Sequence, residues 1–87
     1  MIDVKPLGGG RFAVRVTDGD SETLHEVTVS PGDLERLGRP DEHPEAFVRR
    51  SFEFLLAREP KESILRSFDV SVISRYFPEF EGEIAGA

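Results

Sequence analysis

A β-strand pattern of apolar and polar residues, strict over residues 11–17 and resumed over 22–29, is the feature that most limits the folds open to this chain. In residues 11–17 every second residue is apolar, namely Phe12, Val14 and Val16. A period of two places these side chains on one face of a β-strand. Residues 22–29 resume the pattern, and Asp18-Gly19 before them favours a tight turn, because glycine tolerates a positive φ. The sequence therefore predicts a β-hairpin with one buried face.

A further strand is expected ahead of the hairpin, over residues 2–7. Ile2 and Val4 share one face there. Pro6 cannot donate a backbone hydrogen bond, so the strand is expected either to lie at an edge of the sheet or to end at this residue. The three glycines at 8–10 lead into a strand rather than a helix, so they predict a turn and not a phosphate-binding loop. The prediction is a three-stranded antiparallel meander over residues 2–7, 11–17 and 22–29.

Helical patterns follow the strands. Ser30, Pro31 and Asp33 form an N-terminal capping pattern, which predicts a short helix over residues 31–37. The main helix is predicted over residues 44–58. They carry a broad apolar stripe at helical spacing, formed by Phe47, Val48, Phe52, Leu55 and Leu56.

Two short helices are expected after Pro60, over residues 61–68 and 70–77, and Pro78 ends the second. The tail at 81–87 loses its pattern and is expected to fray. Together these elements predict one α+β domain over residues 1–87, with the helices packed on one face of the meander.

Composition narrows the classes of function. The 87 residues contain no cysteine and carry a net charge of -6, so the broad basic surface of a nucleic-acid binder is missing. No secretory signal and no apolar stretch of membrane-spanning length is visible. We therefore expect a cytoplasmic protein that binds neither a membrane nor, as its main partner, a nucleic acid.

The stretch from residue 63 to residue 80 has the outline of a helix-turn-helix. In the repressor pattern that it resembles, two spacer residues separate a Val-Ser turn from the reading stretch. Here Val70-Ser71 is followed directly by residues 72–75, "VISR". Two missing residues turn a helix face by about 200°, so the cap and the reading face cannot both fit that motif. We expect this segment to pack rather than to read DNA.

A second resemblance concerns the residues "FLLAREPKESILRSFDVSVISRYFPEFE". They resemble the C-terminal part of a family of small bacterial proteins for which no activity is known, and the similarity covers roughly residues 44–81. The resemblance implies a recurring small domain and assigns no role to any residue.

Aromatic residues are the strongest candidates for a functional surface. Seven of the eight aromatic residues lie in residues 47–80. Near the end of this range they form a cluster beside Arg75, made of Phe68, Tyr76, Phe77 and Phe80. Such a cluster either completes the core or forms an exposed protein interface. The first hypothesis is accordingly a module that binds a protein partner or a second copy of itself, as a homodimer.

The alternative is a nucleic-acid-linked regulator, either through the atypical C-terminal segment or as the acidic partner of a basic effector. Its candidate residues are Arg49, Arg50, Arg66 and Arg75. Catalysis ranks third, because no serine lies in a nucleophile-elbow motif, and His25 and His43 are not at metal-ligand spacing. We expect no enzyme activity, no metal and no cofactor.

Overall fold

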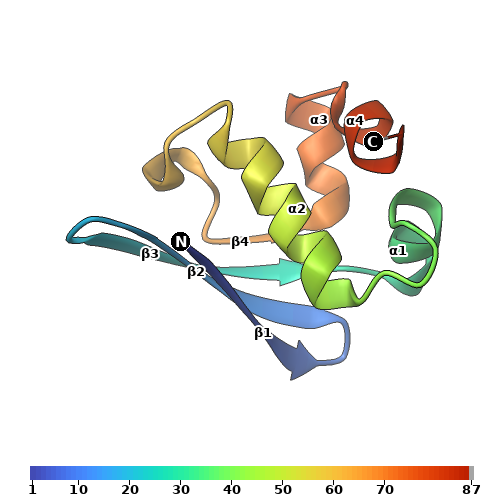
Figure 1. Cartoon of the computed structure of the whole chain (residues 1–87), viewed down its shortest axis with the longest axis horizontal. Helices are drawn as coiled ribbons and strands as arrows, with labels where there is room; N and C mark the ends of the chain where they lie inside the picture. Colours follow the sequence, from blue (N-terminus) through green and yellow to red (C-terminus); the bar gives the residue numbers. More distant parts are fainter. Residues whose placement is uncertain (87) are drawn as a thin grey trace.

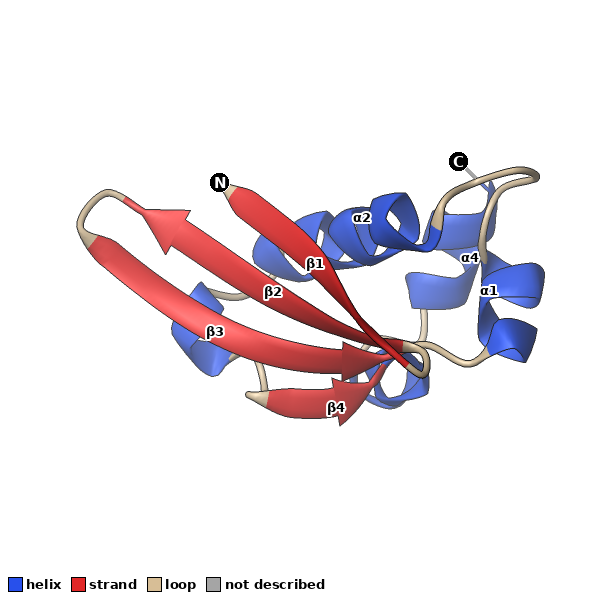
Figure 2. Ribbon diagram, turned by 90° about the horizontal axis from the view of Figure 1, so that it is seen from below, coloured by secondary structure: helices blue, strands red, loops and turns tan. Residues whose placement is uncertain are grey.

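A computed structural model describes residues 1–86 and contains one four-stranded sheet. Its strands are β1 (Ile2–Gly8), β2 (Arg11–Asp18), β3 (Ser21–Thr28) and β4 (Ser67–Asp69), in the order β1-β2-β3-β4. The first three pair antiparallel, which confirms the predicted meander, and β4 pairs parallel to β3. The sheet is therefore mixed, with β1 and β4 at its two edges (Figure 2).

The helices lie on one side of this sheet (Figure 1). They are α1 (Pro31–Leu37), α2 (Pro44–Leu56), α3 (Ile73–Tyr76) and α4 (Phe80–Gly86), with 3₁₀ turns η1 (Lys61–Ser63) and η2 (Val70–Val72). Helix α2 crosses the sheet, and α1, α3 and α4 lie together on one side of it (Figure 1). The α+β class is confirmed. The main helix ends at Leu56, two residues before the predicted end.

The turns and caps that the sequence predicted are present. Gly19 has a φ of 62° in the hairpin turn, and Gly10 has a φ of 79° in the turn before β2. A Cβ on Gly10 would lie 2.8 Å from the carbonyl oxygen of Val29, so any other residue would disturb this turn. At the start of α1, the hydroxyl of Ser30 accepts a hydrogen bond of 3.1 Å from the backbone N–H of Asp33.

The predicted helix over residues 61–68 is wrong. Only η1 is helical there, and the chain then extends into β4. Pairing with β3 supplies the reason, since the N–H of Glu26 donates to the carbonyl of Arg66 at 2.8 Å. The side chain of Phe68 also packs on Phe52 of α2, with ring centroids 6.0 Å apart. The predicted helix over residues 70–77 is present as two consecutive pieces, η2 and α3.

The tail that the sequence predicts to fray is helical in the residues that the structure describes. Residues 80–86 form α4, and Ile84 is only 4% exposed. Arg50 donates a hydrogen bond of 2.7 Å to the carbonyl of Ile84. Arg58 bridges to the carboxylates of Glu79 and Glu83 at 3.1 and 2.7 Å. The last residue of the expected tail, 87, lies outside the described part.

The hydrophobic core fills the space between the helices and one face of the sheet. Phe12, Val14 and Val16 of β2 are all buried, as their alternation predicted. The opposite face of the sheet carries mostly polar side chains, and its large apolar residues Leu7 and Leu24 are 43% and 55% exposed. None of the helices in residues 1–86 has the length and apolar character that crossing a membrane requires.

Candidate functional site

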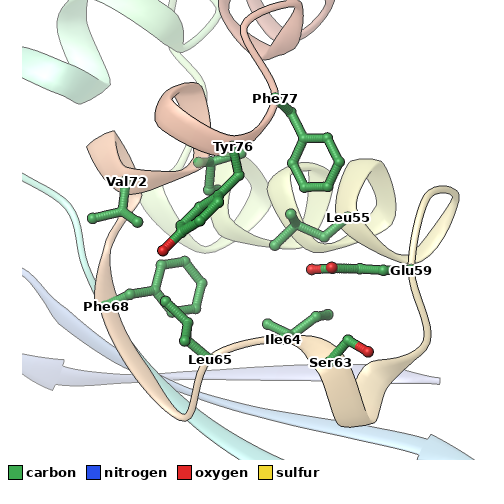
Figure 3. A pocket seen from close by; sticks show the side chains of 10 residues that line it. Leu55, Glu59, Ser63, Ile64, Leu65, Phe68, Val72, Tyr76 and Phe77 are labelled. Carbon is green, nitrogen blue, oxygen red and sulfur yellow. The ribbon is translucent and has the colours of Figure 1, made fainter.

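A pocket of about 360 Å³ lies between the C-terminal end of α2, the segment that enters β4, and helix α3 (Figure 3). Most of its lining is apolar, and the lining residues are Leu55, Glu59, Ser63, Ile64, Leu65, Phe68, Val72, Ile73, Tyr76 and Phe77. A volume near 300 Å³ or above is typical of sites that take small ligands or side chains. The pocket can therefore accept an apolar group of the size of a large side chain.

The walls of the pocket differ in exposure. Ile64 and Ile73 are buried and belong to the hydrophobic core. Tyr76 and Leu65 are 68% and 48% exposed, which makes them the largest apolar side chains at the pocket that face solvent. Phe68 and Phe77 are half-buried. The pocket thus continues outward into an exposed apolar surface, formed by Leu65, Phe68, Tyr76 and Phe77 and called the aromatic surface below.

Core contacts hold the aromatic surface in place. The ring of Phe77 stands edge-on to Phe54 of α2, with centroids 5.9 Å apart, and Phe68 packs on Phe52. The Nδ1 of His25 lies 2.8 Å from the carbonyl oxygen of Leu65. Since a carbonyl can only accept, Nδ1 carries a proton and donates to it. Strand β3 therefore anchors the segment that brings Leu65 to the pocket.

Three of the four predicted aromatic residues meet at this site. Phe68, Tyr76 and Phe77 all line the pocket, whereas Phe80 is 0% exposed and lies edge-on to Phe54 at 5.0 Å. Phe80 is thus a core residue and not available to a partner. Arg75 is exposed on α3, one residue before Tyr76, and does not line the pocket.

Sequence reasoning missed the other lining residues. Leu55 and Val72 follow core-like spacing in the sequence, and nothing in that spacing separates a pocket wall from a core position. For Leu65 the sequence contains a weak indication of exposure. It lies between Ile64 and Arg66, in a short segment that cannot bury every one of its apolar residues. The polar atoms at the pocket come from Glu59, Ser63 and the hydroxyl of Tyr76 (Figure 3).

The four candidate arginines are not equally available to a nucleic acid. Arg50 binds the carboxylate of Glu42 at 2.6 and 2.7 Å, and its side chain is only 16% exposed. This hydrogen-bonded guanidinium holds the pKa of Glu42 below its ordinary value, although burial opposes the shift. Arg49 donates to the backbone carbonyl of Ile2. Arg66 and Arg75 are exposed.

His25 is a core residue rather than a candidate ligand. It is 4% exposed, its Nε2 lies 2.9 Å from the hydroxyl of Thr23, and its ring packs on Phe52 at 5.3 Å. Within residues 1–86, no three histidine, cysteine or acidic side chains are grouped as a metal site would need.

Comparisons of the chain with protein families, with curated proteins and with solved structures found no match. The resemblance of residues 44–81 to a family of small bacterial proteins therefore stays a prediction. Any functional conclusion has to come from the pocket and the aromatic surface themselves.

Proposed function

We propose that this protein is a small protein-binding module that takes an apolar side chain of its partner into the pocket. The observation that carries the proposal is the pocket itself, with the exposed Tyr76 and Leu65 at its rim. Large apolar side chains beside a pocket are typical of interface anchors. Covering each of these two side chains would contribute about 1–2 kcal/mol.

The polar groups at the pocket support binding rather than catalysis. Glu59, Ser63 and Tyr76 come from three different segments, and a few polar groups around an apolar pocket orient a ligand. Binding through such a surface needs no metal and no cofactor. The proposal assigns the contact to Leu65, Phe68, Tyr76 and Phe77, and leaves Phe80 to the core.

The test is a capture experiment with matched variants. The tagged full chain and the variants Tyr76→Ala and Leu65→Asp are incubated with a lysate of the cells that naturally express the chain. Leu24→Asp is the control for Leu65→Asp, because Leu24 is 55% exposed on the opposite face of the sheet. Eluted proteins are quantified by mass spectrometry, and the 260/280 nm absorbance ratio reports nucleic acid.

We expect one partner protein to be captured in equal amounts by the original chain and by Leu24→Asp. The same protein should be missing from the eluates of Tyr76→Ala and Leu65→Asp. Identical eluates from all four chains would overturn it. Another outcome is bound nucleic acid that elutes with salt and is absent when Arg66 and Arg75 are replaced by Ala. That outcome would favour the alternative function, a nucleic-acid-linked regulator.

A further inference from the structure

Strand β4 ends the sheet, and its outer edge lies beside the pocket. In Figure 2 no strand lies beyond it, and the strand order places it last. The carbonyl of Arg66 accepts from Glu26 of β3. Because alternate residues of a parallel strand bond to the same neighbour, Phe68 also faces β3, and the main-chain groups of Ser67 and the N–H of Asp69 face outward. The carbonyl of Asp69, the N-cap residue of η2, already accepts the first hydrogen bond of that 3₁₀ turn. The N–H and C=O of Ser67 and the N–H of Asp69 are therefore available to another strand.

The side chain of Asp69 does not cover this edge. It turns toward η2, where it accepts a hydrogen bond of 2.9 Å from the N–H of Ser71. Ser67 is exposed and carries only a small side chain. The outer edge of β4 is thus free of bulky side chains from its own strand.

The position of Phe68 links this edge to the pocket. Phe68 points to the helix side of the sheet, because it packs on Phe52 of α2 and lines the pocket. A strand added to β4 would lie about 4.8 Å away. A residue placed beside Phe68 in that strand would point to the same side, toward Leu65 and Tyr76 (Figure 3).

From this geometry we propose that the partner is an extended peptide that adds to β4 as a fifth strand and inserts one apolar side chain into the pocket. The main-chain bonds to Ser67 and Asp69 fix the direction of the peptide, and the pocket selects the side chain. This inference rests on the proposed function, since it names how the partner occupies the same pocket.

The experiment uses the full chain and a phage-displayed library of random linear peptides roughly ten residues long. The dissociation constant of the most enriched peptide is then measured for the original chain, Ser67→Pro, Ser67→Ala and Tyr76→Ala. Proline at position 67 removes the outward N–H but leaves the bonds to β3, and edge strands accept proline at such positions. Ser67→Ala is the matched control, because it loses the same hydroxyl and keeps the N–H.

The inference expects an enriched peptide with an apolar residue at a fixed position. Ser67→Pro weakens its binding by about tenfold or more, whereas Ser67→Ala binds as the original chain does. Equal binding by Ser67→Pro and Ser67→Ala, with binding lost in Tyr76→Ala, would overturn strand addition and leave the proposed function standing. Enrichment of no peptide, or binding that none of the variants changes, would overturn strand addition, and the capture experiment would then decide the proposed function.

A second measurement tests the same hydrogen bonds from the side of the peptide. The peptide amides are methylated one at a time, and Ser67→Pro is checked for its fold by circular dichroism. Strand addition expects that methylation of one particular amide abolishes binding, because one peptide N–H must donate to the outward carbonyl of Ser67. A peptide whose binding survives every methylation would contradict strand addition even if Ser67→Pro does not fold.

Discussion

At the scale of single residues, Arg50 connects two distant segments of the chain. It binds both carboxylate oxygens of Glu42, in the loop before α2, and the carbonyl of Ile84 in α4. The Glu42 side chain is only 8% exposed. A buried ion pair of this kind is costly to break from one side, because the remaining charge loses its partner without regaining water.

Glu42→Gln is therefore expected to lower the free energy of unfolding at neutral pH by about 2–3 kcal/mol. The measurement is urea denaturation followed by circular dichroism. Glu22→Gln is the control, since Glu22 pairs with Arg15 at 3.6 Å with both side chains about half exposed. The control should change the stability by less than about 0.5 kcal/mol. A Glu42→Gln chain as stable as this control would contradict the role of the pair.

The same pair predicts a pH dependence. Arg50 lowers the pKa of Glu42 in the folded state, so the unfolded chain takes up this proton first as the pH falls. The stabilisation is complete above the ordinary glutamate pKa of about 4.3 and is lost as the pH falls through the lower folded-state value. The difference in stability between the original chain and Glu42→Gln should therefore shrink below about pH 4.3. A difference that stays constant down to about pH 3 would contradict this linkage.

Single residues also show where sequence reasoning reached its limit. Phe12, Val14 and Val16 were predicted correctly because their burial follows from local alternation. His25 lies on a strand as predicted, but its burial and its hydrogen bond to Leu65 were not predicted, because Leu65 lies forty residues away in the sequence. Local patterns carry no information on such contacts, which only the packing of the whole chain brings together.

At the scale of elements, local periodicity predicted the meander, α1 and α2 but not β4. Ile64, Leu65 and Phe68 fit helical spacing, yet a segment of eight residues between Pro60 and Asp69 fits either structure. The free edge of β3 decided the outcome, because it could take a parallel partner. That Phe68, Tyr76 and Phe77 lie close together could be predicted, because they are near one another in the sequence. The pocket between them could not be predicted, because it depends on the position of β4.

Helix α4 gives the prediction that belongs to this scale. Ile84→Ala should lower the free energy of unfolding by about 2–4 kcal/mol, because it leaves a cavity against the core. Leu24→Ala removes the same kind of side chain from an exposed position and should cost under about 1 kcal/mol. Denaturant titration compares the two. Equal effects would mean that α4 does not dock on the core and that the frayed tail expected from the sequence was right.

At the scale of the whole molecule, one chain is enough to complete the core. Its radius of gyration is 12.1 Å, close to the value of about 12 Å that a compact chain of 87 residues has. Within residues 1–86, every buried side-chain nitrogen and oxygen has a hydrogen-bond partner. Five of the eight aromatic residues are buried, including Phe47, Phe52 and Phe80.

A self-sufficient core predicts a thermal unfolding midpoint that does not depend on protein concentration. We expect the same midpoint over about a hundredfold range of concentration, because no second copy is needed to cover the core. Circular dichroism at low concentration and calorimetry at high concentration measure it. A midpoint that rises with concentration would mean that two copies join. If Tyr76→Ala then abolished the rise, the aromatic surface would be the contact between those copies rather than the binding site for a peptide.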